Sequence, residues 1–412
     1  MCLAALRKGM YHFGPQGVHW LVETIDERGT MTATTHDITR DRFMLVGGLA
    51  RKGYDWWWHS FTARHAETGE ERAFFVEFFT VNPELGGPEP LFGMAPDGTR
   101  DGRQPSYLMV KCGTWGKDAR QLHRFFAWDE VEVDREVPYR VAAGDCVACE
   151  TRLAGSVSVS AEDAAAHPEW MSDAGEMSFN LRVDKLIAFN VGYGASDAVR
   201  ATEAFQMFWH AEGVKCAYEG EVILDGERYL VDPDTCFGYA DKNWGSDFTT
   251  PWVWLASSDL TSRLTGQRLS ASALEIGGGR PKVGPVALDR KLLGELVYEG
   301  APYEFNFSKL WTGSKTEFGC HETEAEVVWH VEQTTHHAKL VTDVWCDKAD
   351  MLLIRYEAPD GQARHTRLWN GGNGHGRTQL FEREGGEWRL VDDIDCGHMG
   401  CEYGEYDAVE PY

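Results

Sequence analysis

The chain contains 412 residues, enough for two or three domains of about 100–200 residues each, and its 43% hydrophobic content can fill sizeable cores. A disordered or fibrous chain is thereby excluded. Acidic residues outnumber basic ones by 65 to 40, and the formal charge of −25 repels nucleic-acid phosphates and anionic lipid headgroups.

Aromatic residues are abundant, with 16 Trp, 14 Tyr and 20 Phe. A helical bundle of this size would use Leu and Ala instead, so the composition favours β structure around an aromatic-lined interior. No run approaches the ~18 apolar residues that span a bilayer, and Arg7-Lys8 follow the N-terminal apolar run too early for a secretory signal. We therefore expect a soluble cytoplasmic protein with no transmembrane segment and no nucleic-acid partner.

The ten cysteines are too sparse and irregularly spaced for a disulfide scaffold, and a reducing compartment would keep them as thiols. Cys146 and Cys149 form a lone CxxC without a second pair at zinc-finger spacing. Two ordinary thiols are favoured there over a structural zinc.

Most elements expected along the chain are short antiparallel strands joined by hairpins, because polar and apolar residues alternate between Gly, Asp and Asn. The clearest hairpin covers residues 219–231, where Asp225-Gly226 fits a type I′ turn. Similar turn signals occur at Asp97-Gly98, Asp101-Gly102, Asp360-Gly361 and Gly385-Gly386.

Two segments are predicted to be helical. Ser160 to Ala166 has Ser160 as N-cap and acidic residues in the first turn. A longer helix is predicted from about Ser196 to Trp209, with an apolar face that would pack against a sheet. The best candidate for a domain boundary is the tight connection Val231–Asp234, which gives expected domains of residues 1–235 and 236–412.

The stretch most informative about chemistry is Gly238–Gly245, followed by Pro251–Leu255. If it is extended, Asp241 and Asn243 share one face, which Lys242 and Trp244 do not join. Desolvation in an aromatic-lined cavity would raise the pKa of Asp241 and suit it to act as a general acid. The alternative is that Asp241 and Lys242 anchor a loop by hydrogen bonds while Trp244 fills core.

The run from Tyr239 to Gly245, with Trp252-Val253-Trp254 after a short gap, resembles the tocopherol cyclase signature Tyr-Ala-Glu-Lys-Asn-Trp-Gly followed by Trp-Phe-Trp. Asp241 stands where the plant enzymes have Glu. Residues 273–279 are similar to the family's downstream Gly-Gly-Gly segment, and residues 54–59 look like its Tyr-Glu-Gly-Trp-Tyr-Phe pattern. The resemblance covers most of the chain from about Tyr54 onward.

This resemblance implies an all-β fold of two lipocalin-like antiparallel β-barrel or sandwich domains with a few short helices, shared more remotely with carotenoid hydratases and fungal decalin-forming cyclases. It also implies a ligand between or within the barrels, and chemistry without a metal or organic cofactor. Two departures stand out. Trp56 replaces the small Gly, which would shrink or reshape the cavity, and His59 stands where an aromatic residue is usual.

We therefore expect a cofactor-independent enzyme that cyclises, hydrates or isomerises a double bond in a hydrophobic lipid, isoprenoid or polyene-like molecule, an isomerase, cyclase or hydro-lyase. Protonating an alkene creates a cation that needs a strong acid in a dry pocket and electron-rich Trp faces. The expected catalytic residues are Asp241 as acid, His59 as partner base and Asn243. The expected substrate-binding residues are Trp57, Trp58, Trp244, Trp254 and Glu275.

The other class of function left open is a non-catalytic carrier that only holds a hydrophobic ligand, because fold does not fix function. The other motifs do not indicate a metal, dinucleotide or nucleophile site. His321, His330, His336 and His337 favour strands and a solvated hairpin tip over a metal site, and Gly371–Gly376 is predicted to be a mobile loop rather than a dinucleotide fingerprint. The sequence has no HExxH and no GxSxG, so we expect neither a metal nor a serine nucleophile.

Overall fold

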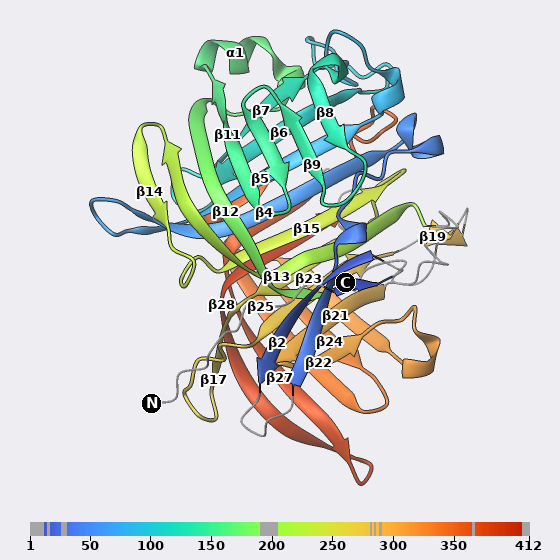
Figure 1. Cartoon of the computed structure of the whole chain (residues 1–412), viewed down its shortest axis with the longest axis vertical. Helices are drawn as coiled ribbons and strands as arrows, with labels where there is room; N and C mark the ends of the chain where they lie inside the picture. The colour runs from blue at the N-terminus through green and yellow to red at the C-terminus, as the bar shows by residue number, and fades with distance from the viewer. Residues whose placement is uncertain are drawn as a thin grey trace.

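A computed structural model describes residues 12–14, 17–25, 31–189, 205–280, 282–283, 286–287, 291–364 and 367–405, the side chains only from residue 37 onward. Two large antiparallel sheets dominate it (Figure 1). Strands hold 61% of the described residues and helices 8%, so the all-β prediction of two lipocalin-like domains is confirmed. No helix in these ranges is both long and apolar enough to cross a bilayer.

The first sheet has twelve strands. Its members are β4 (Tyr54–His65), β5 (Glu71–Val81), β6 (Tyr107–Thr114), β7 (Arg120–Phe126), β8 (Val131–Asp134), β9 (Arg140–Ala143), β10 (Cys146–Cys149), β11 (Arg152–Val159), β12 (Gly175–Phe189), β13 (Met207–Leu224), β14 (Glu227–Val231) and β15 (Gly238–Gly245). Strand β15 pairs with both β13 and β4 and so lies at the centre of this sheet.

The second sheet has eleven strands. Its members are β16 (Trp252–Ser257), β17 (Asp259–Ser262), β18 (Ala273–Gly279), β21 (Lys291–Tyr298), β22 (Ala301–Phe305), β23 (Lys315–Glu322), β24 (Glu326–Thr334), β25 (Ala338–Asp347), β26 (Met351–Leu353), β27 (Arg367–Glu384) and β28 (Glu387–Glu405). Two small sheets are formed by β1 (His12–Gly14), β2 (Gly17–Ile25) and β3 (Met31–Asp37), and by β19 (Lys282–Val283) and β20 (Val286–Ala287).

In the ranges that the structure describes, helical structure is limited to short segments. The α-helix α1 (Ala161–Ala166) begins after Ser160, whose hydroxyl accepts from the Asp163 backbone N–H, as predicted. The 3₁₀ turns are η1 (Ile38–Arg40), η2 (Gly47–Ala50), η3 (Pro83–Leu85), η4 (Trp128–Glu130), η5 (Pro168–Trp170), η6 (Leu310–Thr312) and η7 (Lys348–Asp350).

The predicted hairpins are confirmed at turns that require residues with positive φ. Asp225 and Gly226, between β13 and β14, both have positive φ (49° and 84°), as a type I′ turn requires. Gly385 and Gly386 likewise join β27 to β28 with φ of 60° and 95°. His336 and His337 lie exposed in the turn between β24 and β25, in keeping with the expected hairpin tip.

Two predictions from the sequence are wrong. The helix expected over 196–209 does not extend to Trp209, because Met207–Trp209 belong to strand β13. Residues 196–204 lie outside the described residues. Gly371–Gly376 is not a loop but part of β27, whose irregular pairing with β28 occurs at these glycines. A Cβ on Gly372 would lie 2.3 Å from the Trp115 ring, so the glycine is needed for close packing.

The buried apolar side chains of the described residues form three clusters. One lies within the first sheet around Trp57, Phe61 and Phe74, and a second lies within the second sheet. The third joins the two sheets, because it contains side chains from β4, β5, β13 and β15 together with those of β16, β18 and β21. Strand β15 belongs to the first sheet although it follows the boundary expected at residue 235, so we propose that the domains divide within residues 246–251.

His398 ties the two sheets together at one edge. Its Nδ1 lies 2.6 Å from Asp259 Oδ2, and its Nε2 lies 2.6 Å from Glu71 Oε1 on β5 of the first sheet. Carboxylates only accept hydrogen bonds, so the ring must carry both protons. Burial lowers the pKa of His398, but the hydrogen bonds to Asp259 and Glu71 outweigh it and raise the pKa above its ordinary value.

Replacing His398 by Gln should destabilise the protein in a pH-dependent way. A histidine whose folded pKa is raised contributes stability that is complete below the unfolded pKa of about 6.5 and is lost as pH rises through the folded value. The loss in unfolding free energy should therefore be largest in mild acid and shrink toward alkaline pH, as measured by denaturant titration. His330→Gln, which removes a largely exposed pair with Asp343, is the control and should change stability little. Equal loss at every pH would show that His398 acts through packing alone.

Candidate functional site

The register of three central strands decides which side chains can meet. Asp241 lies opposite Trp58 on β4 and Ala211 on β13, while Lys242 lies opposite Trp57 and His210. Alternation therefore turns Asp241 and Asn243 toward the second sheet and Lys242 into the interior of the first. The predicted sharing of one face by Asp241 and Asn243 is confirmed.

Asp241 is buried without an ion-pair partner among the described residues. Its Oδ2 accepts hydrogen bonds from Trp209 Nε1 at 3.0 Å and from the Tyr239 hydroxyl at 3.1 Å. Burial raises the pKa of Asp241 to about 7, although N–H and O–H donors, chiefly Trp209 and Tyr239, act in the opposite direction. Desolvation thus poises this carboxyl to exchange protons near neutrality.

Glu402, on β28 of the second sheet, faces the same region. Its carboxyl accepts from Trp252 Nε1 and, at 3.1 Å, from Asn370 Nδ2. Burial raises the pKa of Glu402 to about 7, against these hydrogen bonds and with a further upward contribution from the charge of Asp241. Two carboxyls from different sheets therefore titrate close to neutral pH and influence each other.

Two further buried carboxyls belong to this interface. Glu275 on β18 lies 2.7 Å from the Tyr239 hydroxyl, and burial raises the pKa of Glu275 well above its usual range. Glu77 on β5 pairs with Lys111 at 3.1 Å and accepts from Tyr356 at 3.2 Å. Burial raises the pKa of Glu77 and lowers that of Lys111, with their mutual attraction opposing both shifts.

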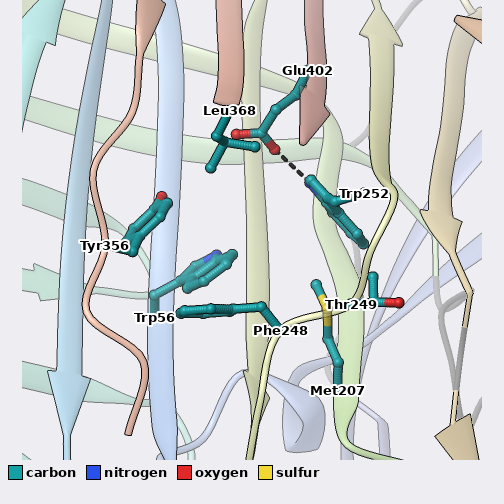
Figure 2. Close-up of a pocket in the computed structure, with 8 residues that line it drawn as sticks. All are labelled: Trp56, Met207, Phe248, Thr249, Trp252, Tyr356, Leu368 and Glu402. Carbon is teal, nitrogen blue, oxygen red and sulfur yellow. Dashed lines mark hydrogen bonds between the residues drawn. The ribbon is translucent and has the colours of Figure 1, made fainter. Parts of the chain in front are cut away.

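A small cavity lies between the carboxyls of Asp241 and Glu402. Its volume is about 20 Å³, room for one or two water molecules. Its lining consists of Trp56, Trp58, Asp241, Trp252, Trp254, Tyr356, Asn370 and Glu402. An adjoining pocket shares several of these residues and adds Met207, Phe248, Thr249 and Leu368 (Figure 2).

Trp56 lines both pockets and packs among other aromatic side chains at their boundary. Figure 2 shows its indole between Tyr356 and Phe248, and its ring is parallel to Tyr356 within 8° at a centroid distance of 5.3 Å. Tyr54 and Phe79 also contact it, with centroids 5.2 and 6.2 Å away. The sequence expectation that Trp56 narrows the cavity agrees with this packing.

His59 is not brought together with Asp241, because it lies on the opposite face of β4, opposite Ala240. Its Nδ1 contacts the Tyr218 hydroxyl at 2.8 Å, and burial lowers the pKa of His59 to about 3, so the ring is neutral. The expected pairing of His59 as base with Asp241 as acid is therefore corrected: the sheet separates them.

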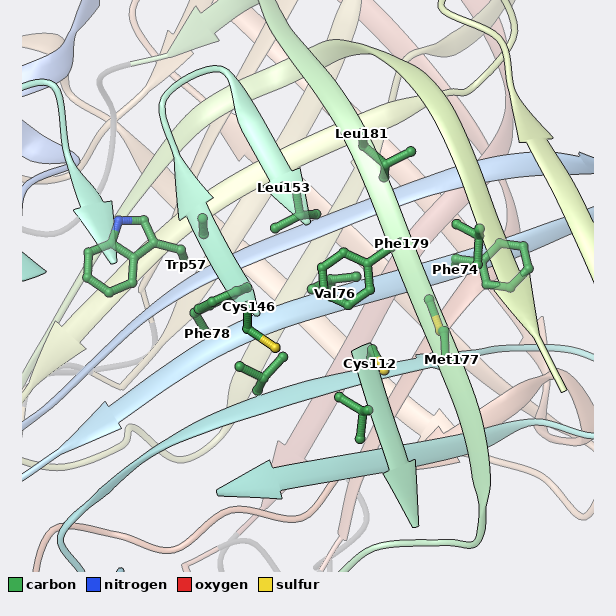
Figure 3. Close-up of a cluster of buried hydrophobic side chains, with 14 of the residues drawn as sticks. Trp57, Phe74, Val76, Phe78, Cys112, Cys146, Leu153, Met177, Phe179 and Leu181 are labelled. Carbon is green, nitrogen blue, oxygen red and sulfur yellow. The ribbon is translucent and has the colours of Figure 1, made fainter. Parts of the chain in front are cut away.

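Trp57 and Trp244 also face away from the cavity. Figure 3 shows Trp57 within the apolar cluster of the first sheet, where Lys242 Nζ lies 3.8 Å above its ring and forms an ion pair with Asp55. Trp244 stacks on Phe208. Of the residues expected at the site, Asp241, Asn243, Trp58, Trp254 and Glu275 share the interface between the sheets, whereas His59, Trp57 and Trp244 do not.

Asn243 connects two strands next to the cavity. Its Oδ1 accepts from the Tyr54 hydroxyl at 2.8 Å, which links β15 to β4 beside Trp56. It does not line the cavity that contains Asp241.

Glu402, Tyr356, Asn370 and Trp252 complete the cavity but were not identified as site residues from the sequence. In β28, Glu402 lies between two buried apolar residues, Cys401 and Tyr403, which point to the opposite face of the strand. A Glu in an alternating pattern of this kind ordinarily faces solvent. The only sequence signal is the glycine at 400: a Cβ there would lie 2.2 Å from the Trp254 ring, so this strand approaches a Trp that the motif does identify. In the described ranges no group of three or more His, Cys, Asp or Glu is arranged to hold a metal ion.

Comparisons with known proteins give remote likenesses only. No family model matches the chain, and no curated protein matches it. A protein from Nitrosomonas europaea provisionally assigned as AttH has 11% identity and a TM-score of 0.37, covering 86% of this chain and 93% of that one. The crystal structure of CghA with Sch210972 has 12% identity and a TM-score of 0.41, covering 87% and 90%.

Replacing Trp56 by Ala should cost about 3–5 kcal/mol of unfolding free energy, as for other buried large-to-small aromatic changes, and should enlarge the cavity. Denaturant titration measures the first effect, and binding of a small apolar fluorescent probe measures the second. Trp311→Ala is the control, because Trp311 is 77% exposed and should change neither. A folded Trp56→Ala variant that binds no more probe than the natural protein would show that the cavity collapses.

Proposed function

We propose that this protein is a cofactor-independent enzyme that uses acid/base chemistry to cyclise, hydrate or isomerise a hydrophobic unsaturated small molecule. The observation that supports this most is that Asp241 and Glu402, each with a pKa near 7, line one aromatic cavity between the two sheets. Perturbed carboxyls of this kind concentrate at sites of proton transfer.

One carboxyl of this pair can donate a proton while the other accepts one. The charge of Asp241 raises the pKa of Glu402, so ionisation of Asp241 disfavours ionisation of Glu402, and in the proposed reaction the pair holds one proton near neutrality. In the proposed reaction Asp241 donates its proton to a double bond, and ionised Glu402 removes a proton from the resulting cation. If water captures the cation instead, the same proton balance gives hydration.

The walls suit a cationic intermediate. Trp56, Trp252 and Trp254 line the cavity, and the face of an indole attracts a cation by about 0.5–2 kcal/mol, more when the site is dry. Trp254 is among the substrate-binding residues predicted from the sequence, whereas Trp57 and Trp244, also predicted, face away from the cavity. A substrate larger than one or two waters must displace Trp56 from its stack on Tyr356, so we place the entry there.

The second candidate function is a carrier that binds a hydrophobic molecule without changing it. A site used only for apolar binding would be lined by apolar groups with a few orienting polar ones. Asp241, Glu275 and Glu402 are buried at this interface without a cationic partner among the described residues, and because such groups cost stability, their presence favours the enzyme.

The test begins with the hydrophobic molecule that copurifies with the protein, identified by extraction and mass spectrometry. Asp241→Asn and Glu402→Gln should each lower turnover by ~10²–10⁴-fold while ligand affinity changes little, because only the proton transfer is removed. Incorporation of solvent deuterium into product reports the same step. The control is Asp343→Asn, an exposed carboxyl on β25 outside the cavity.

Near-normal turnover by both folded variants would contradict acid/base catalysis at this pair. Ligand binding without turnover in the natural protein would favour the carrier.

A further inference from the structure

Tyr239 stands between two carboxyls. Its hydroxyl oxygen lies 2.7 Å from Glu275 Oε1 and 3.1 Å from Asp241 Oδ2. All three side chains are buried, and they come from β15 and β18, one from each side of the interface. The Tyr239 hydroxyl therefore links the second sheet directly to the proposed acid.

The number of available protons determines which of Asp241, Tyr239 and Glu275 donates each hydrogen bond. A tyrosine hydroxyl has one proton to donate, and an ionised carboxylate has none. Tyr239 can thus donate to one carboxyl only, and the other contact needs a protonated carboxyl that donates to the tyrosine oxygen. Burial and the two neighbouring carboxyls raise the pKa of Tyr239 well above 10, so the hydroxyl keeps its own proton.

The proton of the second contact belongs on Glu275. Asp241 Oδ2 accepts from Trp209 Nε1, which can only donate, and a second donor on the same oxygen, the Tyr239 hydroxyl, favours a form of Asp241 with no proton on Oδ2. Glu275 lies directly opposite Glu295 on β21, and two buried like charges in a cross-strand pair repel each other. No Lys or Arg in the described part of the chain forms an ion pair with Glu275, and its contact with Tyr239 has the length of an ordinary O–H···O bond.

We propose that Glu275 and Tyr239 form a proton relay that restores the proton of Asp241 after each turnover. The proposal rests on the function proposed above. When Asp241 has given its proton to the substrate, the Tyr239 proton passes to Asp241 Oδ2 while the Glu275 proton passes to the tyrosine oxygen. Glu275 regains a proton from solvent, and Glu402 releases to solvent the proton that it took, so that the cycle neither gains nor loses protons.

In this arrangement Glu275 is a positioning and proton-supplying residue that acts through Tyr239. Tyr239→Phe removes one hydrogen bond to the Asp241 carboxylate and should slow the first turnover of protonated enzyme to that extent, while slowing later turnovers by at least about 10-fold more. Rapid-mixing kinetics with enzyme in excess, and then with substrate in excess, separate the two rates. Equal slowing of both would show that Tyr239 only positions Asp241, and would overturn the relay.

Infrared difference spectroscopy tests the proton on Glu275 without any substrate. At a pH about one unit above the Asp241 pKa, a protonated-carboxyl C=O band should be lost in Glu275→Gln and should shift in Tyr239→Phe, which removes its hydrogen bond. Glu295→Gln is the matched control, since Glu295 is an equally buried carboxyl one strand away, and the Tyr239-sensitive band should survive in it.

Absence of such a band, or a band that Tyr239→Phe leaves in place, would overturn the relay whatever the activity. A Tyr239-sensitive band in a protein whose turnover does not depend on Asp241 would instead support the proton placement and contradict the proposed function, so that the two failures can be told apart. Glu275→Gln, which keeps a neutral hydrogen-bonding group, should fold normally by circular dichroism.

Discussion

Strand β15 has no face toward solvent, and this constraint governs the rest of the structure. All eight of its residues are buried, because one face packs inside the first sheet and the other meets the second sheet. The two faces treat charge differently. Lys242 is neutralised by Asp55 on the inner face, whereas Asp241 on the outer face has only neutral hydrogen-bond donors. Burial raises the pKa of both carboxyls, but the attraction of Lys242 limits the rise of Asp55 to about 6, whereas Asp241, which has no cation beside it, rises to about 7.

Close packing between the sheets depends on glycines placed opposite large aromatic side chains. A Cβ on Gly277 would lie 2.8 Å from the Trp209 ring, and one on Gly400 would lie 2.2 Å from the Trp254 ring. Trp209 in turn donates to Asp241. The Gly-Gly-Gly segment that resembles the cyclase pattern thus has a packing role with a direct effect on the site: it lets the indole that holds the acid approach the second sheet.

The sequence predicts what depends on neighbours along the chain. The hairpin at Asp225-Gly226, the N-cap at Ser160 and the shared face of Asp241 and Asn243 all follow from turn chemistry or from alternation within one strand. Register between strands is not local, and it alone decides that β15 places Asp241 beside Trp58 and away from His59. Glu402 escapes prediction for the same reason, since it reaches the cavity only through the pairing of β16 with β28, about 150 residues apart in the sequence.

The buried carboxyls proposed for proton transfer also make the stability of the interface depend on pH in one direction. Asp241 and Glu402 have folded pKa values near 7, above those of ordinary carboxyls, so the native state binds more protons than the unfolded state between about pH 4 and pH 7. Stability therefore falls as pH rises through that window. The contribution of His398 at the edge of the same interface is lost as pH rises further. Deprotonation consequently weakens the contact between the sheets at both places, and the carboxyls that lose protons line the cavity between them. In the proposed reaction, a proton donated to the substrate leaves a carboxylate in a desolvated cavity, stabilised directly by neutral donors, chiefly Trp209 and Tyr239, and this favours rapid return of the proton to Asp241.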